Sequence, residues 1–240
     1  MTPTSITWRT SNVMTSEPRL PLQAVLFDLD GTLLDTAPDM IGALNRLLVE
    51  RGRDALSHES MRRYVSHGSA RLVRVGFADA AESELPALQQ RFLEIYRVHL
   101  SAGTTLFPGM QEVLDDLRQL KLEVAIVTNK PGWLTAPLLQ QLRLDDGFAC
   151  VVSGDTLPER KPHPLPLLHA ARVAGAEPSR CVYVGDAERD IQAARGAGMT
   201  SLIARYGYIG ADEAIDDWRA DGLLNSPHEL LSWLRANGHV

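Results

Sequence analysis

The chain has only two cysteines among its 240 residues. Cys150 and Cys181 lie far apart, and neither belongs to a cysteine pair with the spacing of a zinc site or a disulfide framework. Each stands beside a valine, and free cysteine is among the residue types most often buried. We therefore expect two free thiols in a reducing cytoplasm.

Basic residues are not in excess, since 24 Lys and Arg stand against 30 Asp and Glu, a net charge of −6. This balance argues against a general nucleic-acid surface. No apolar run is long enough to span a bilayer. We expect no nucleic-acid and no membrane partner, and a cytoplasmic monomer or weak homodimer.

The first residues, "MTPTSITWRTSNVMTSEPRLP", are rich in Thr, Ser and Pro and lack the continuous apolar stretch of a secretory signal. Such a composition is typical of disordered termini. We expect residues 1–21 to be a disordered extension, with Met14 as an alternative translation start.

Short apolar runs alternate with helical patterns through the rest of the chain, which is 45% hydrophobic. The runs cover residues 24–27, 124–127, 150–153, 181–184 and 201–204. Strands spaced by helix-length segments are typical of βαβ units around a parallel sheet. The sequence therefore predicts an α/β fold with a Rossmann-like core, in which helices flank a mostly parallel sheet.

A long segment interrupts this alternation, because residues 36–122 have helical periodicity and no convincing strand pattern. Apolar residues share one face in each of two helical patterns: Ile41, Leu44, Leu47 and Leu48 in the first, and Leu88, Phe92, Ile95 and Leu100 in the second. A single crossover does not need so much chain. We expect a helical cap at 38–104, a core formed by 22–37 and 105–240, and a crossover helix within 107–120.

Polar side chains follow the predicted strands where the strands end. In open parallel sheets, ligands bind outside these carboxyl ends. The candidates are Asp28 and Asp30 after the first strand, Thr128 and Asn129 after the second, and Asp186 and Asp190 after the fourth. Lys161, in "ERKPHP", lies between the second and the fourth strands in the sequence.

Like charges as close as Asp28 and Asp30 repel unless a cation or a shared proton compensates. Mg²⁺ takes oxygen ligands and commonly uses one or two carboxylates with a substrate phosphate. With Lys161 also neutralising charge, Asp28 fits a nucleophile that attacks phosphorus, and Asp30 fits a general acid and base. Thr128, Asn129 and backbone amides would hold the phosphoryl oxygens.

Four stretches, "DLDGTLLDT", "VTNKP", "KPHP" and "GDAERD", resemble in order the motifs of the haloacid dehalogenase-like hydrolases. The resemblance is to the phosphatase branch, whose helical cap follows the first motif. It implies that Asp28 is the nucleophile, Asp30 the acid and base, Thr128 a phosphate ligand and Lys161 the balancing cation. Because the dehalogenases lack the second acid, Asp30 points to phosphate esters.

The same resemblance implies that Mg²⁺ is held by Asp28, by the main-chain carbonyl of Asp30 and by Asp186, with Asp190 supporting from nearby. One position departs from the family pattern, since Leu165 follows "KPHP" where related phosphatases usually carry an acidic residue. An acidic residue there would cap the next helix, so the change concerns the helix more than the chemistry.

Substrate choice depends on the cap, where Gly68, Ser69 and Arg71 belong to a polar break, "SHGSARLV", that could meet the substrate. This break, "RYGYI" and "DDWRADGLLNSPHEL" resemble phosphatases of N-acetylmuramic acid 6-phosphate, which favours that sugar. Phosphatases of 2-phosphoglycolate, which share "VTNKP" and "KPHP", are the alternative. A phosphosugar mutase and a non-catalytic phosphometabolite-binding protein remain further alternatives.

Overall fold

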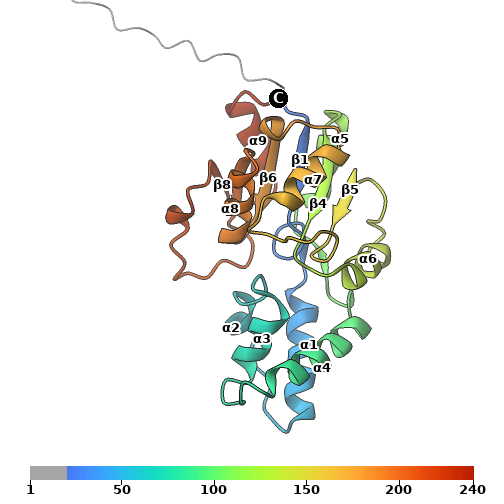
Figure 1. Ribbon diagram of the computed structural model, residues 1–240, viewed down its shortest axis with the longest axis vertical. Helices are drawn as coiled ribbons and strands as arrows, with labels where there is room; N and C mark the ends of the chain where they lie inside the picture. Colours follow the sequence, from blue (N-terminus) through green and yellow to red (C-terminus); the bar gives the residue numbers. More distant parts are fainter. Residues whose placement is uncertain (1–20) are drawn as a thin grey trace, which may run out of the picture.

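The computed structural model describes residues 21–240, which form a core built on a parallel sheet and a helical cap beyond one end of that sheet (Figure 1). The extension expected at 1–21, with the alternative start at Met14, lies outside the described residues except for Pro21. The C-terminus lies at the end of the core away from the cap.

Six strands form the sheet in the order β5-β4-β1-β6-β7-β8, and every neighbouring pair is parallel. The strands are β1 (Ala24–Phe27), β4 (Glu123–Val127), β5 (Cys150–Val152), β6 (Cys181–Gly185), β7 (Thr200–Ala204) and β8 (Gly222–Leu224). The first five confirm the predicted strands. The sequence analysis did not predict β8 at the edge.

Alternate residues of β1 enter different hydrophobic clusters, because successive side chains of a strand point to opposite faces. Val25 and Phe27 pack with residues of α5, α6 and α9, and Ala24 and Leu26 pack with residues of α7 and α8. These helices are α5 (Met110–Gln119), α6 (Gly132–Gln141), α7 (Leu165–Val173), α8 (Glu188–Gly196) and α9 (Glu229–Ala236). Burial on both faces explains why the strand is continuously apolar.

The insertion after β1 contains four helices, α1 (Ala37–Glu50), α2 (His58–Arg62), α3 (Gly68–Gly76) and α4 (Leu85–Val98). All eight apolar residues assigned to the faces of the two helical patterns are buried. Figure 1 shows these helices together beyond the carboxyl end of β1. The helical insertion is confirmed, whereas its bounds at 38–104 stay a prediction.

A two-stranded antiparallel ribbon, β2 (Leu34–Asp35) with β3 (Thr105–Leu106), stands where the chain enters and leaves the insertion. The expectation of no strand within 36–122 was therefore wrong at β3. Two residues are too few to show an alternating pattern, so the sequence carried no signal for this strand.

The remaining regular elements are two short 3₁₀ turns, η1 (Pro178–Arg180) and η2 (Ile215–Trp218). Both cysteines are free thiols, with Cys181 buried and Cys150 half-buried. Within residues 21–240, no helix combines the length and the apolar character that crossing a membrane requires.

Candidate active site

The site lies where β1, β4 and β6 end side by side in the middle of the sheet. Asp28 directly follows β1, Thr128 directly follows β4, and Asp186 directly follows β6. All three side chains are buried. The parallel sheet thus brings together groups that are far apart in the sequence, at the end that faces the cap.

Lys161 occupies the centre of this cluster, and its side chain is almost fully buried. Its ammonium lies 2.8 Å from Asp28 Oδ1 and 2.7 Å from Asp190 Oδ1. It also donates to the carbonyl oxygen of Val127 at 2.8 Å and to the hydroxyl of Tyr183 at 2.7 Å. Four acceptors fix one cation, so Lys161 compensates the buried negative charge at a set position.

The carboxylates of Asp28, Asp186 and Asp190 each offer an oxygen within 4.8 Å of the other two. Asp186 Oδ2 accepts a hydrogen bond from the backbone N–H of Tyr208 at 3.0 Å. Its Oδ1 is buried and has no hydrogen-bond partner within the described residues. A buried oxygen left unpartnered beside two further carboxylates fits a hard divalent cation.

Two glycines make room for Asp186. A Cβ on Gly31 would lie 2.1 Å from Asp186 Oδ2, and one on Gly207 would lie 2.6 Å from Asp186 Cβ. Gly31 also has φ +84°, a left-handed conformation that strains any other L-residue. The glycine of "DLDGT" is therefore required by both space and backbone shape.

Burial raises the pKa of Asp186 to about 7, and the nearby carboxylates of Asp28 and Asp190 contribute to the shift. The pKa of Asp28 is also raised, because burial outweighs the opposing effect of Lys161. A cation at this cluster would favour the ionised form of both carboxyls.

Thr128 and Asn129 lie beside the cluster and hold the surrounding loops. Thr128 Oγ1 accepts from the backbone N–H of Lys130 at 3.1 Å. The Asn129 amide donates to the carbonyl oxygen of Lys161 at 2.9 Å and accepts from its N–H at 3.1 Å. Asn129 thus fixes the backbone of Lys161, a contact that the sequence analysis did not predict. The expected bond of Asn129 to phosphoryl oxygens stays a prediction.

Asp30 contacts a second buried lysine, which the sequence analysis missed. Lys130 Nζ lies 3.0 Å from Asp30 Oδ1 and donates at 2.8 Å to the hydroxyl of Tyr96, a residue of α4 in the cap. Burial alone would lower the pKa of Lys130, but Asp30 and Tyr96 outweigh it and raise that pKa. Core and cap therefore meet at the ammonium of Lys130, next to Asp30.

A second contact between cap and core is made at Asp186. Ser66, in the turn between α2 and α3, donates its hydroxyl to Asp186 Oδ2. The guanidinium of Arg189 donates to the carbonyl oxygen of Ser66 at 2.7 Å. The cap thus covers the carboxylate cluster in this structure.

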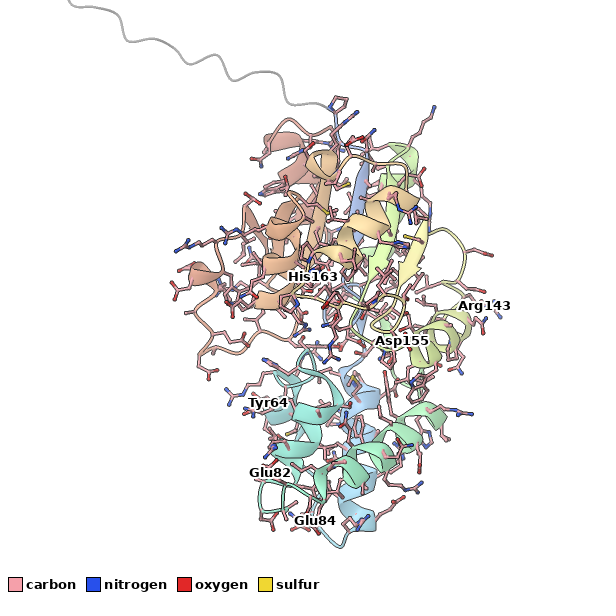
Figure 2. All side chains as sticks on the ribbon, in the orientation of Figure 1. Tyr64, Glu82, Glu84, Arg143, Asp155 and His163 are labelled. Atoms are coloured by element: carbon pink, nitrogen blue, oxygen red, sulfur yellow. The ribbon has the colours of Figure 1, made fainter. Side chains whose placement is uncertain are left out.

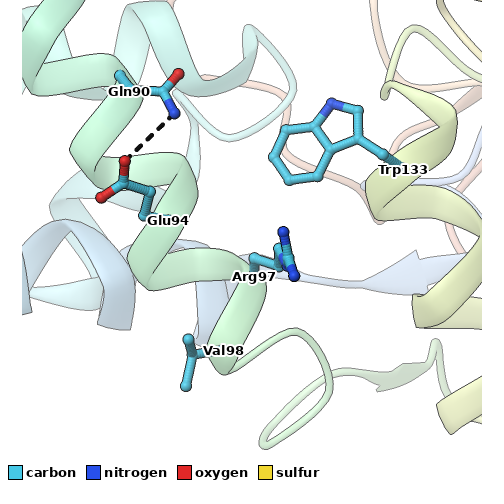
Figure 3. A pocket seen from close by; sticks show the side chains of 5 residues that line it. All are labelled: Gln90, Glu94, Arg97, Val98 and Trp133. Carbon is cyan, nitrogen blue, oxygen red and sulfur yellow. Dashed lines mark hydrogen bonds between the residues drawn. The ribbon is translucent and has the colours of Figure 1, made fainter.

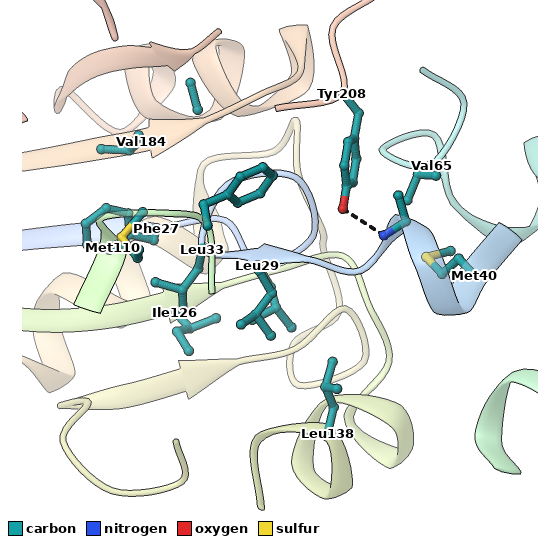
Figure 4. Close-up of a cluster of buried hydrophobic side chains, with 14 of the residues drawn as sticks. Phe27, Leu29, Leu33, Met40, Val65, Met110, Ile126, Leu138, Val184 and Tyr208 are labelled. Carbon is teal, nitrogen blue, oxygen red and sulfur yellow. Dashed lines mark hydrogen bonds between the residues drawn. The ribbon is translucent and has the colours of Figure 1, made fainter. Parts of the chain in front are cut away.

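The third contact lies at the base of the cap. Arg62 of α2 makes two hydrogen bonds to Asp35, at 3.1 and 2.9 Å, and its guanidinium lies 4.9 Å from the ring centroid of Tyr208. The Tyr208 hydroxyl donates to Asp35 at 2.9 Å. It also accepts from the N–H of Ala37 at 2.9 Å, the dashed line in Figure 4. Tyr208 therefore joins Asp186, through its own N–H, to Ala37, the first residue of α1.

The three cap residues predicted to meet substrate lie in the first turn of α3. Ser69 Oγ accepts from the amide of Gln89, and Arg71 lies 5.5 Å from the ring centroid of Tyr64. Neither contact reaches the carboxylates, and Gly68 is half-buried with φ +79°. Their role in substrate binding stays a prediction, whereas Ser66, two residues before Gly68, does reach the core.

Signals for the missed residues were weak. Lys130 stands directly after two predicted ligands in "VTNKP", so its position in the motif could have identified it. Tyr96 lies among the apolar residues of a cap helix and resembles ordinary core. Ser66 belongs to the quoted "SHGSARLV", but nothing in its type distinguishes it from its neighbours.

The loop after Lys161 shows how the chain begins α7 without an acidic cap. Leu165 is the first residue of α7, and its N–H donates to Nδ1 of His163 at 3.1 Å. Figure 2 shows His163 in the half of the core that faces the cap. The ring of His163 thus takes one of the helix's free N–H groups, the role we expected of an acidic residue at 165.

A cavity of about 290 Å³ lies between α4 of the cap and the start of α6. Figure 3 shows the indole of Trp133 facing the side chains of α4 across it. Its lining residues are Gln90, Glu94, Arg97, Val98 and Trp133. None of the carboxylates described above borders this cavity.

Comparison with known proteins agrees with the arrangement of the site. The family model for haloacid dehalogenase-like hydrolases matches residues 25–204. A phosphoglycolate phosphatase of Xanthomonas campestris is 46% identical over 208 residues, which cover 87% of this chain and 94% of that protein. An N-acetylmuramic acid 6-phosphate phosphatase of Pseudomonas putida is 39% identical over 210 residues, with coverage of 87% and 94%.

The fold is shared with solved structures. One described as a predicted phosphoglycolate phosphatase, from Haemophilus somnus, superposes with a TM-score of 0.78 at 28% identity and covers 88% of this chain and 97% of its own. The matched family, the near-complete coverage and the buried carboxylate cluster agree with one another. The chain therefore belongs to the haloacid dehalogenase-like hydrolase family, and it is a phosphatase acting on a small phosphorylated metabolite.

Proposed function

We propose that the chain hydrolyses 2-phosphoglycolate to glycolate and inorganic phosphate through an aspartyl-phosphate on Asp28. The observation that carries the mechanism is the ion pair between buried Asp28 and Lys161, whose atoms lie 2.8 Å apart. A second acid, Asp30, follows Asp28 by two residues. Lys161 compensates the charge of the nucleophilic carboxylate, and Asp30 supplies a proton donor beside it.

The two oxygens of Asp28 have different surroundings. Its Oδ1 accepts from Lys161 and from the N–H of Leu29, both at 2.8 Å. Its Oδ2 has no hydrogen-bond partner among residues 21–240, and we assign this oxygen the attack on phosphorus. The P–O bond to glycolate breaks as the bond to Oδ2 forms, and Asp30 gives its proton to the leaving oxygen.

The second half-reaction returns the enzyme to its starting state. Asp30, now ionised, takes a proton from a water that attacks phosphorus on the side opposite to Asp28. The bond between phosphorus and Oδ2 breaks, and phosphate leaves. Throughout, Lys161 keeps Asp28 and Asp190 compensated, and the backbone of its loop is held by Asn129.

The donor set fits Mg²⁺, which Asp28, Asp186 and the main-chain carbonyl of Asp30 would hold, with Asp190 nearby. When bound, the ion would offset negative charge on the phosphoryl oxygens. Thr128, buried at the end of β4, is the side chain we assign to a phosphoryl oxygen.

Two substrates compete within this mechanism. The sequence motifs of the cap and C-terminal loops favour N-acetylmuramic acid 6-phosphate, whereas the more similar relatives are phosphoglycolate phosphatases. The cap also contacts the core directly above the carboxylates, through Ser66 and Tyr96. This close cover favours the smaller ester, so 2-phosphoglycolate is our first candidate and the muramic sugar the second.

The experiment is phosphate release from 2-phosphoglycolate, N-acetylmuramic acid 6-phosphate and glucose 6-phosphate, compared by kcat/KM. We expect release in Mg²⁺, at least about 10-fold preference for 2-phosphoglycolate, and loss of release in EDTA that added Mg²⁺ restores. Preference for the muramic sugar would select the second candidate. A glucose phosphate isomer formed without free phosphate would instead indicate a mutase.

A further inference from the structure

The chain has three lysines, of which Lys130 and Lys161 are buried. An ammonium has three N–H donors. Lys161 has four oxygen acceptors around it, so its donors are fully used. Lys130 has only two acceptors among residues 21–240, Asp30 Oδ1 and the Tyr96 hydroxyl. One N–H of a buried cation is therefore left for a ligand.

Tyr96 also has an unused hydrogen-bond donor. Its hydroxyl accepts from Lys130, and within the described residues its own O–H donates to no acceptor. The side chain is buried, with 1% of the residue exposed, and Lys130 has 8% exposed. Buried donors without acceptors are costly, and here two of them stand 2.8 Å apart.

Their position follows from Asp30. If Asp30 protonates the leaving oxygen, the leaving group must lie against its carboxyl. Lys130 Nζ is 3.0 Å from that carboxyl, and the hydroxyl of Tyr96, from the cap, lies 2.8 Å from the same Nζ. The two spare donors therefore border the leaving-group side of the site rather than the phosphoryl side, which Lys161 and Thr128 border.

We propose that Lys130 and Tyr96 form a subsite for a carboxylate on the leaving group, next to the ester carbon. This inference rests on the proposed hydrolysis of phosphomonoesters and names the feature by which a substrate is chosen. A carboxylate would accept one N–H from Lys130 and the O–H from Tyr96, a charge-assisted pair in a site shielded from water. Because Tyr96 belongs to the cap, the subsite is complete only when the cap is closed.

The subsite separates the two candidate substrates. In 2-phosphoglycolate the carboxylate is one methylene away from the ester oxygen, within reach of groups that border Asp30. In N-acetylmuramic acid 6-phosphate the carboxylate is on the lactyl ether, on the other side of the sugar ring from the ester. The chemistry of Lys130 and Tyr96 thus favours an α-phosphoryloxy carboxylate.

The test compares 2-phosphoglycolate with ethyl phosphate, which has the same carbon skeleton without the carboxylate. We expect the wild type to prefer 2-phosphoglycolate by kcat/KM. In Lys130→Met that preference should fall about 30-fold or more, whereas Lys130→Arg should retain part of it. In Tyr96→Phe the preference should fall about 5-fold, the effect of one neutral hydrogen bond.

Binding provides a readout without turnover. Titration calorimetry in Mg²⁺ would compare 3-phosphonopropionate, an isostere of 2-phosphoglycolate that cannot be hydrolysed, with propylphosphonate. The variants should lose affinity for the first compound and keep their affinity for the second. Lys121→Met is the matched control, since Lys121 is an exposed lysine in the turn before β4 and should leave both affinities unchanged.

The outcomes are distinct. If Lys130→Met lowers kcat/KM equally for both esters, Lys130 only positions Asp30 and the subsite is wrong. If the wild type prefers 2-phosphoglycolate and all variants keep that preference, the carboxylate binds elsewhere and the substrate proposal stands. If the wild type hydrolyses other esters but not 2-phosphoglycolate, the proposed substrate itself fails. Should Lys130→Met not fold, the ester comparison and the calorimetry with Tyr96→Phe still test the subsite.

Discussion

Lys161 Nζ lies 2.8 Å from Asp28 Oδ1, and only 1% and 4% of these two side chains are exposed. Removing one partner of a buried pair leaves an uncompensated charge, which costs about 3–5 kcal/mol. We expect Lys161→Met to lower the free energy of unfolding by about this amount at pH 7 and to abolish turnover. Urea unfolding measures the first effect, with Lys121→Met as control. Unchanged stability would mean that Lys161 does not compensate Asp28.

The pH dependence of stability should report Asp186, whose pKa is raised from 3.8 to about 7 by burial and by its neighbouring carboxylates. Because the folded protein binds this proton more tightly than the unfolded chain, its stabilising effect is complete below about pH 4 and is lost as pH rises through about 7. A shift of this size is worth up to about 4 kcal/mol.

We therefore expect the stability difference between wild type and Asp186→Asn, measured in EDTA, to move against the wild type from pH 5 to pH 8. The comparison isolates Asp186 because both proteins share all other titrating groups. A difference that stays constant over this range would show that the Asp186 carboxyl is already ionised at pH 5.

The base of the cap offers a test of closure at Arg62, which contacts both Asp35 and the ring of Tyr208. We expect Arg62→Gln to open the cap, raising the radius of gyration in X-ray scattering and lowering kcat/KM about 10-fold. The matched control is Arg63→Gln. Arg63 pairs with Asp212 on the surface, where such a pair contributes little. Equal effects of the two variants would contradict a special role for Arg62.

Much of the core was predictable because its signals are local. A buried parallel strand is continuously apolar, so Ala24, Val25, Leu26 and Phe27 indicated β1 from sequence alone. The carboxyl end of such a strand also predicts where Asp28 lies. The edge strand β8 and the two-residue β3 are too short or too exposed for that pattern, so they were missed.

Contacts between cap and core were not predictable, because they depend on how the helices of the insertion pack against the core. Tyr96 shares a helix with buried Phe92 and Ile95, and nothing in the pattern shows that its hydroxyl reaches Lys130. Asn129 illustrates the reverse case. Its place in the motif predicted a phosphate ligand, which stays a prediction, and did not show that its amide is hydrogen-bonded to the backbone of Lys161, which lies on a loop distant in sequence.

The central claim is that Asp28 is the nucleophile, and the most direct measurement is phosphate release by purified Asp28→Asn. The amide is nearly isosteric but a poor nucleophile, so we expect kcat to fall about 1,000-fold or more while the thermal unfolding midpoint shows a folded protein. Asp145→Asn, at an exposed position, should keep wild-type activity. Release by a folded Asp28→Asn at more than about a tenth of the wild-type rate would contradict the covalent mechanism.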